Sequence, residues 1–311
     1  MVSHDDIRKA ADLIRQGGLV AFPTETVYGL GANALDERAV ARVYDVKGRP
    51  VASPLIVHVS SIEMARELAA EWPESAERLA RRYWPGPLTL VLPKHPKIPD
   101  LVTAGLQTVG LRMPAHPVAL DLIREAGVPI AAPSANRFAQ LSPTTAGHVR
   151  ESLGDLVDMV LDAGPTEVGI ESTVLSLAGE RPVLLRLGMI SRRDLEELIG
   201  PVEVAEAPPG SHASPGLHPR HYSPRTPLVL VRQGRVPAHG RGAFLGFAEE
   251  VSAPVAELVH MPPDPALYAA MLYRTLHRLD REGLDWIAVE QPPDTPDWAA
   301  ILDRLKRAAE G

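Results

Sequence analysis

Two positively charged side chains flank a glycine in the segment Lys47-Gly48-Arg49-Pro50. A lysine ammonium and a forked arginine guanidinium at this spacing can hold the phosphates of a nucleotide. The same residues can also end a helix, because cations complement the helix dipole and glycine fits the left-handed position after the last turn. The pattern G-x-x-x-x-G-K-[ST] does not occur, which excludes a Walker A loop. The segment therefore predicts either a phosphate clamp or a helix cap.

Hydroxyl, amide and cationic side chains also stand where apolar runs begin or end. Taken singly, each is explained by a turn, a helix cap or a surface cation. Five such strand ends at one edge of a sheet would instead form a binding site. The residues concerned are Thr24 and Thr26 after 19–22, Arg112 at the end of 109–112, Ser134 and Asn136 after 130–132, Ser172 before 173–177, and Arg186 near the end of 183–187. Ser142, in a hydroxyl-rich run up to Thr145, precedes a predicted helix, and its plain interpretation is an N-cap.

Several classes of chemistry are excluded by what the sequence lacks. There is no cysteine, so disulfides, thiolate metal sites and cysteine nucleophiles are ruled out. The patterns H-x-x-x-H and G-x-S-x-G are absent, no G-x-G-x-x-G follows the first strand, and no convincing metal triad is visible. A net charge of −7 argues against binding nucleic acid through bulk charge.

The composition is that of a globular protein, with 45% hydrophobic and 23% charged residues. No apolar run approaches the roughly 18–20 residues that cross a bilayer. Residues 1–6 lack the basic-then-apolar layout of a signal peptide. We therefore expect a cytoplasmic protein that does not span a membrane.

The elements that must position these side chains alternate irregularly between helix and strand. Helices are predicted from the Ser3 cap to Gly17 and over 36–46, 62–71, 74–83, 117–126 and 191–199. Strands are predicted over 19–22, 55–57, 88–92, 109–112, 130–132, 157–161, 173–177 and 183–187. Some strands are joined by helices and others only by loops. This pattern indicates an α/β domain on a mixed sheet and not a clean doubly wound fold.

Residues 205–227 are rich in proline and histidine and have the composition of a linker. Beyond them, strands are predicted over 228–232, 243–247 and 286–290, and helices over 265–281 and 297–309. The chain is thus expected to divide into a domain over 1–204, a Pro-rich linker over 205–227 and a small α/β domain over 228–311.

The motifs, taken together, resemble the L-threonylcarbamoyladenylate synthase family in its long, two-domain form. The order and density of the motifs make the resemblance specific, and it covers essentially the whole chain. It implies a YrdC-like domain with a twisted, mixed parallel and antiparallel sheet flanked by helices, followed by a small Rossmann-like α/β domain. The segments that carry it are residues 18–30, Lys47-Gly48-Arg49-Pro50, residues 84–89, Pro133-Ser134-Ala135-Asn136, and Ser214-Pro215-Gly216 with Arg220-His221-Tyr222.

The resemblance implies that L-threonine, bicarbonate and ATP, with Mg²⁺, give threonylcarbamoyl-AMP and pyrophosphate. A partner transferase would then move the threonylcarbamoyl group to the adenosine beside the tRNA anticodon. A threonine carbamate that attacks the α-phosphate of ATP needs several anions held in line, water excluded and developing charge offset. No protein nucleophile is required for this chemistry.

The resemblance also implies roles for individual residues. Lys47 and Arg49 would act in catalysis. His221 and Tyr222 would reach from the linker onto the nucleotide, so that the linker acts as a lid on the active site. Ser53 stands where the family often has asparagine, and Ala132 where some members have threonine. Mg²⁺ would come with ATP and not be held by protein side chains. L-threonine would be bound by Thr26, His58, Arg112 and Ser172, and ATP by Lys47, Arg49, Ser53, Thr108, Ser134, Asn136, Ser142, Arg186, His221 and Tyr222.

Two other classes of function compete with this interpretation. One alternative is an RNA-binding module, because YrdC-like domains have a concave basic surface; steep salt dependence would reveal it. As an enzyme of the family, the chain would make at most a weak tRNA contact. A carbamoyltransferase accessory domain of the hydrogenase-maturation type is the other alternative. That type usually carries acylphosphatase and zinc-finger-like segments, and this cysteine-free chain has neither.

Overall fold

The computed structural model describes residues 2–205 and 222–309. Within residues 2–205 the strands form a ten-stranded sheet in the order β10-β9-β8-β4-β5-β3-β6-β2-β1-β7. Its strands are β1 (Val20–Phe22), β2 (Gly29–Asn33), β3 (Ile56–His58), β4 (Leu88–Pro93), β5 (Thr108–Arg112), β6 (Ile130–Ala131), β7 (Met159–Val160), β8 (Thr173–Ser176), β9 (Val183–Arg186) and β10 (Glu203–Val204). The accompanying helices are α1 (His4–Arg15), α2 (Glu37–Lys47), α3 (Ile62–Arg66), α4 (Glu74–Tyr83), α5 (Asp100–Thr103), α6 (Pro117–Ala126), α7 (Ala146–Leu153) and α8 (Arg192–Ile199), with a short 3-10 helix at Gly154–Leu156.

The sheet is mixed, as the sequence predicts. β3 pairs parallel with β5, and β4 pairs parallel with β8, whereas β4 with β5 and β8 with β9 are antiparallel. In this register His58 lies opposite Arg112, Leu88 opposite Thr173 and Val174 opposite Arg186. The ends of β3, β5 and β9 therefore lie in one row, although these strands are far apart in the sequence, because β4 and β8 lie between β5 and β9.

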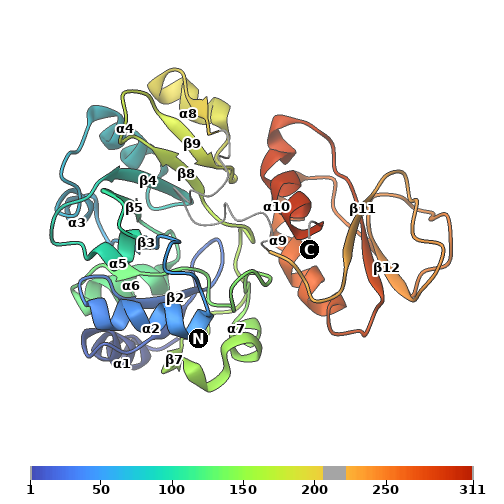
Figure 1. The fold of residues 1–311 in the computed structure, drawn as a ribbon, viewed down its shortest axis with the longest axis horizontal. Helices are drawn as coiled ribbons and strands as arrows, with labels where there is room; N and C mark the ends of the chain where they lie inside the picture. Colours follow the sequence, from blue (N-terminus) through green and yellow to red (C-terminus); the bar gives the residue numbers. More distant parts are fainter. Residues whose placement is uncertain (1, 206–221, 310–311) are drawn as a thin grey trace.

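Local sequence explains how the helices around this sheet begin and end. Ser3 and Asp6 form a reciprocal capping box at the start of α1. Asp36 caps α2 through its side chain, and Gly48, with φ of 59°, ends that helix in the left-handed region. Figure 1 shows α1 and α6 together near one end of the sheet and α4 with α8 at the other. Thr145 caps α7, so the cap that the sequence offered to Ser142 belongs to Thr145.

The structure also differs from the sequence prediction in places. Residues 29–33, expected to be loop, form β2, because Gly31 lets the strand approach Phe22 and Ile130 where a Cβ would meet their side chains at 2.7 and 2.8 Å. The helix expected over 62–71 ends at Arg66, since the chain then turns to pair Ala69 with Lys94. The short elements α5, β10 and β13 (Glu257–His260) carry no periodic apolar pattern and were not predicted.

The C-terminal unit is a parallel four-stranded sheet in the order β11-β14-β12-β13. It comprises β11 (Leu228–Val231), β12 (Gly242–Gly246), β13, α9 (Pro265–Leu279), β14 (Trp286–Glu290), a 3-10 helix at Pro296–Trp298 and α10 (Ala299–Ala309). Helices α9 and α10 lie between this sheet and the larger domain (Figure 1). The small, Rossmann-like unit that the sequence predicts is therefore present, with α9 and α10 on one face of its sheet and loop residues on the other.

The two units share a hydrophobic core. Val27, Leu141 and Ile170 of the larger domain are buried in one cluster with Leu272 and Leu276 of α9. Such continuity means that the C-terminal unit covers apolar surface of the larger domain. Within residues 2–205 and 222–309, none of the helices combines the length and the apolar character that a membrane span requires.

Candidate active site

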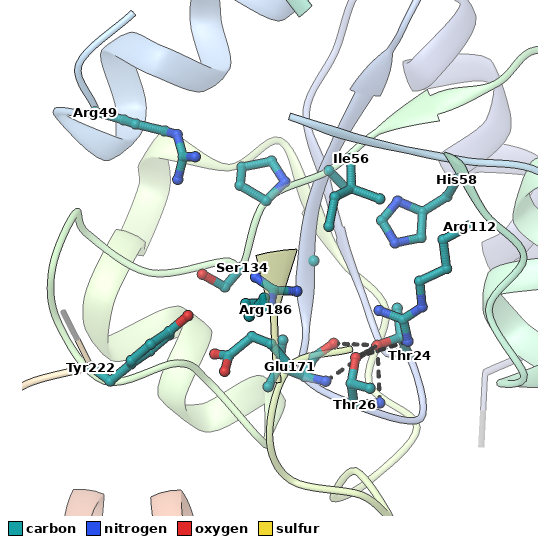
Figure 2. A pocket seen from close by; sticks show the side chains of 14 residues that line it. Thr24, Thr26, Arg49, Ile56, His58, Arg112, Ser134, Glu171, Arg186 and Tyr222 are labelled. Carbon is teal, nitrogen blue, oxygen red and sulfur yellow. Dashed lines mark hydrogen bonds between the residues drawn. The ribbon is translucent and has the colours of Figure 1, made fainter. Parts of the chain in front are cut away.

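A pocket opens in the larger domain where the row of strand ends faces the turns after β1 and β6. Figure 2 shows Arg49 and Tyr222 on one side of it and His58 and Arg112 on the other. Most of its lining residues come from the predicted strand ends and from the segment after α2. They are Thr24, Thr26, Val27, Gly29, Arg49, Ile56, His58, Arg112, Ala132, Pro133, Ser134, Glu171, Arg186 and Tyr222.

Arg112 is held in place by a buried carboxylate. Its Nη2 donates to Glu25 Oε1 at 2.7 Å and to Thr26 Oγ1 at 2.9 Å. The other oxygen of Glu25 accepts the backbone N–H of Ala115 at 3.0 Å, and both charged side chains are buried. Thr24 shares a hydrogen bond with Thr26 at 2.9 Å, which fixes the turn after β1. This wall presents a fixed cation and a hydroxyl, a pair suited to a carboxylate and a small polar group.

His58 lies beside Arg112 and stays neutral. Its ring stands edge-on to Phe22, with centroids 6.0 Å apart. Burial, and then the charge of Arg112, lower the pKa of His58 to about 3. Its Nδ1 has no hydrogen-bond partner among the residues that the structure describes. A neutral imidazole at this wall can bind a ligand hydroxyl without adding charge.

The neutrality of His58 predicts a pH-dependent stability. The pKa of histidine in an unfolded chain is near 6.5. As the pH falls below about 6.5, His58 is therefore protonated in the unfolded chain but stays neutral in the folded protein. Folding free energy is then lost towards the folded pKa of about 3, at up to roughly 1.4 kcal/mol per pH unit. Urea unfolding of the wild type and of His58→Gln between pH 6 and 4 measures the effect. The wild type should lose stability more steeply, and parallel pH curves for the two proteins would show that His58 is not the source.

The segment after α2 proves to be both a helix cap and part of the pocket wall. Gly48 ends α2, and the turn directs Arg49 into the pocket, where Nη2 donates to the Pro54 carbonyl at 3.1 Å and Nε to the Ser53 carbonyl at 3.4 Å. Burial lowers the pKa of Arg49 to about 10, which leaves the guanidinium charged at neutral pH. Arg49 is thus a fixed cation on the wall opposite Arg112.

Lys47 does not line the pocket. Its Nζ donates to the carbonyls of Ser134 and Asn136, each at 2.5 Å. Asn136 Nδ2 in turn donates to the carbonyls of Arg137 and Gln140, both at 2.9 Å. Burial, followed by the charge of Arg49, lowers the pKa of Lys47 well below its ordinary value. Lys47 therefore acts in this structure as the support of the turn that presents Ser134.

The third wall is built where β8 begins and β9 ends. Arg186 donates from Nε to the Ser172 carbonyl at 3.0 Å and from Nη2 to Ser172 Oγ at 3.1 Å. Ser172 Oγ also shares a hydrogen bond with Thr89 at 2.9 Å. These bonds join β4, β8 and β9, and they fix the direction of the Arg186 side chain.

The structure brings together about half of the residues that the sequence singled out. Four of the predicted residues lie behind the wall, each bonded to a residue that lines it: Lys47 and Asn136 to Ser134, Ser142 to Glu171 and Ser172 to Arg186. Ser53 touches Arg49 through its carbonyl, and Thr108 lines a smaller pocket that also includes Ile56. His221 lies outside the described residues. The predicted residues that line the main pocket are Thr26, Arg49, His58, Arg112, Ser134, Arg186 and Tyr222.

Sequence analysis missed the two carboxylates that organise the walls. Glu25 lies inside the motif over 18–30 and Glu171 directly precedes Ser172, but neither carboxylate was given a role, although a carboxylate among buried cations is a usable signal. Glu171 accepts Ser142 Oγ at 2.5 Å on one oxygen. Its other oxygen accepts Arg304 Nε at 2.7 Å and the Tyr273 hydroxyl at 3.2 Å. Arg304 and Tyr273 come from the C-terminal unit, where nothing in the sequence marks them.

The site therefore combines three fixed guanidinium groups, hydroxyls and a neutral imidazole around one cavity. Arg112 is paired with Glu25, whereas Arg49 and Arg186 bond to carbonyl and hydroxyl oxygens. Such a cavity can bind more than one anionic group at once and offset charge that develops between them.

Comparison with known proteins agrees with this geometry. Residues 12–188 match the Sua5/YciO/YrdC family, whose description is telomere recombination, and residues 190–310 match the C-terminal domain of threonylcarbamoyl-AMP synthase. Threonylcarbamoyl-AMP synthase of Bacillus subtilis is 44% identical over 98% of this chain and 93% of that protein. A putative threonylcarbamoyl-AMP synthase of Mycobacterium tuberculosis is 42% identical over 62% of this chain and 89% of that protein.

A crystal structure supports the likeness in three dimensions. Pyrococcus abyssi Sua5 in complex with L-threonine matches with a TM-score of 0.92 and 40% identity, over 99% of this chain and 95% of that one. The matches to two family models and to full-length relatives show that this chain belongs to the threonylcarbamoyl-AMP synthase family and is an enzyme of the nucleotidyltransferase kind.

Proposed function

We propose that the pocket binds L-threonine and ATP side by side, and that bicarbonate supplies the carbon that joins them. The observation that carries this proposal is the separation of the cations within one cavity. Arg112 is fixed by Glu25 next to Thr26 and His58, whereas Arg49 and Arg186 stand on the remaining walls. One wall suits the carboxylate of an amino acid, and the others suit phosphates.

The reaction then follows from how these groups are placed. The Arg112 guanidinium holds the threonine carboxylate, and Thr26 with neutral His58 receives the polar side chain. Bicarbonate takes up a proton, its C–OH bond breaks, and it gives CO₂ and water. The threonine amine adds this CO₂, a C–N bond forms, and the nitrogen releases a proton to solvent, which balances the proton that bicarbonate took up. An oxygen of the resulting carbamate attacks the α-phosphorus of ATP, and the bond to pyrophosphate breaks. Arg49 and Arg186 offset the charge of the phosphates during this displacement, so the protein works by positioning and electrostatics.

Magnesium is proposed to enter with the triphosphate. The carboxylates nearest the pocket are already committed, Glu25 to Arg112 and Glu171 to Arg304. Within residues 2–205 and 222–309 there is no group of three or more His, Asp or Glu side chains placed to hold a metal ion. The side chains in this part of the chain do not fit a preformed magnesium site.

The product, a mixed anhydride of a carbamate and AMP, is unstable in water and calls for a second enzyme that accepts it. We propose a tRNA-modifying threonylcarbamoyl transferase as that partner, with at most a weak tRNA contact by this chain. The proposed lid would reach the nucleotide through His221 and Tyr222. The ring of Tyr222 lines the pocket, which supports the half of this proposal that the structure describes.

The decisive experiment is pyrophosphate release from ATP in the presence of bicarbonate, with and without L-threonine. We expect release to require threonine, because the carbamate of threonine is the nucleophile. Pyrophosphate release that is the same in the absence of threonine would contradict the proposal, and so would its failure to occur under both conditions.

Arg49→Ala tests the phosphate wall. The variant loses a charged hydrogen-bond donor worth about 1.5–3 kcal/mol, so threonine-dependent pyrophosphate release should fall by roughly 10–100-fold. Arg38→Ala, an exposed change on helix α2, which precedes Arg49, is the control and should behave as the wild type. Normal turnover and normal ATP affinity in Arg49→Ala would show that the segment Lys47-Gly48-Arg49 serves only to end the helix.

A further inference from the structure

Arg304 belongs to the C-terminal unit, yet its side chain reaches the wall of the active site. It lies in α10 and is 1% exposed. Its Nε donates to Glu171 at 2.7 Å and its Nη2 donates to the Leu187 carbonyl at 2.9 Å, and both acceptors belong to the larger domain. Its Nη1 donates to the neighbouring Asp303 at 2.7 Å. Every nitrogen of the guanidinium therefore has a partner, and two of the three bonds cross the domain boundary.

Glu171 is the point where these contacts meet the pocket. Its side chain lines the pocket, and both of its oxygens are engaged. One accepts Ser142 Oγ, and the other accepts Arg304 and the Tyr273 hydroxyl of α9. Helices α9 and α10 thus hold a residue of the active-site wall from behind.

Arg304 also supports Tyr222 on the same wall. The Arg304 guanidinium carbon lies 5.0 Å from the centre of the Tyr222 ring, and that ring stacks on Tyr273 at 6.0 Å. Tyr222 is buried and has a φ of 62°. Residues other than glycine adopt this backbone conformation when the surrounding packing holds them in it. The packing that holds it is supplied by α9 and α10.

The charges explain why Arg304 matters beyond packing. Burial alone would raise the pKa of Glu171, but Arg304, then Arg186 and the Ser142 hydrogen bond, hold it below its ordinary value. Arg186 lines the same pocket as Glu171 and is bonded to Ser172, the residue that follows Glu171 in the chain. If Arg304 were neutral, the buried carboxylate would draw Arg186 as its remaining counter-charge.

We propose that Arg304 is a positioning residue for ATP: by holding Glu171 and Tyr222 it keeps Arg186 directed at the nucleotide phosphates. The C-terminal domain thereby takes part in substrate binding without touching the substrate. This inference rests on the proposed ATP site, in which Arg186 contacts the phosphates.

The test compares three variants in threonine-dependent pyrophosphate release. In Arg304→Met the KM for ATP should rise about tenfold or more, because the released carboxylate competes for Arg186. The KM for L-threonine should change less than about threefold, because its wall is fixed separately by Glu25. Arg304→Lys keeps the positive charge but loses the forked guanidinium, so its KM for ATP should lie between those of the wild type and Arg304→Met. Arg281→Met, which removes a half-exposed ion pair with Glu151 across the same domain boundary, should stay within about twofold of the wild type.

A double variant separates positioning from simple attachment of the domains. Arg304→Met combined with Glu171→Gln removes the stray carboxylate, so the KM for ATP should return to within about threefold of the wild type. If the two changes only loosen the interface, the double variant should be worse than either single variant. That result, or a folded Arg304→Met protein with a wild-type KM for ATP, overturns the proposal.

Tyr273→Phe decides the matter if Arg304→Met does not fold. It removes one hydrogen bond to Glu171 without changing any charge, and the KM for ATP should rise about threefold to tenfold. An unchanged KM in this variant overturns the proposal. A wild-type protein that releases no pyrophosphate from ATP would instead overturn the proposed function itself, so the two failures are distinguishable.

Discussion

Arg112→Met is expected to lower kcat/KM for L-threonine by about 1000-fold, because removing one partner of a buried charge pair costs roughly 2–5 kcal/mol. Among the described residues, Arg112 is the only cation on the wall that it forms with Thr26 and His58, where we propose that L-threonine binds. The variant loses this cation and leaves the Glu25 carboxylate without its partner, close to the carboxylate of the substrate. The KM for ATP should change little, because Arg49 and Arg186 are held by other bonds. Steady-state kinetics with each substrate varied in turn gives both constants.

A double variant separates binding from folding in this experiment. Arg112→Met alone should lower the free energy of unfolding by about 3–5 kcal/mol, since it leaves a buried carboxylate without its counter-charge. Adding Glu25→Gln should restore most of that stability but little of the threonine binding. Arg124→Met, which removes an exposed ion pair with Asp121 on α6, is the control and should change neither quantity. A threonine kcat/KM near the wild-type value in the folded double variant would remove Arg112 from the substrate site.

The sequence shows that several strands end in polar or cationic residues, but it does not show which of these strand ends become neighbours. Apolar runs followed by Thr26, Arg112, Ser134 and Arg186 are visible without a structure. Which of them become neighbours depends on strand order and register, for example on β4 lying between β5 and β8. The β4–β5 pairs join residues 15–21 positions apart and the β4–β8 pairs join residues 85 positions apart, and no local pattern records which strands become neighbours.

The segment Lys47-Gly48-Arg49 shows how local patterns can satisfy two interpretations at once. The helix cap is real, and it is what turns Arg49 into the pocket. Lys47 is different, because its ammonium supports the carbonyls of Ser134 and Asn136. The role in ATP binding and catalysis that the resemblance implies for Lys47 stays a prediction. A charge pattern gives the type of group but not the direction in which it points.

The contribution of the C-terminal unit was the least predictable part. Arg304 stands in an amphipathic helix with several other charged residues, and its partner Glu171 is 133 positions away. Sequence composition assigns such an arginine to the solvent-exposed face, whereas the structure buries it completely. The shared core could not be foreseen either, since Val27 and Ile170 lie next to motifs that read as polar loops.

That shared core makes removal of the C-terminal unit a severe change. A chain ending at residue 205 would expose Val27, Leu141 and Ile170, each of which loses up to roughly 1.5–3 kcal/mol of burial free energy. It would also leave Glu171 without Arg304 and Tyr273. The Mycobacterium tuberculosis relative matches only 62% of this chain, so a smaller protein of the family can exist. The surface exposed here, however, is adapted to a second domain.

We therefore expect the chain ending at residue 205 to lose at least about 99% of its threonine-dependent pyrophosphate release, because the wall that we propose to hold the phosphates collapses with Glu171. Circular dichroism and thermal unfolding establish whether the truncated domain still folds. Residues 222–311, expressed separately and added in trans, should recover part of the activity by covering the same core and restoring Arg304. The same C-terminal fragment carrying Arg304→Met should cover the core but recover much less activity. Unchanged turnover in the truncated chain would show that the C-terminal unit has no part in the active site, and equal rescue by the two fragments would show that it contributes through burial alone.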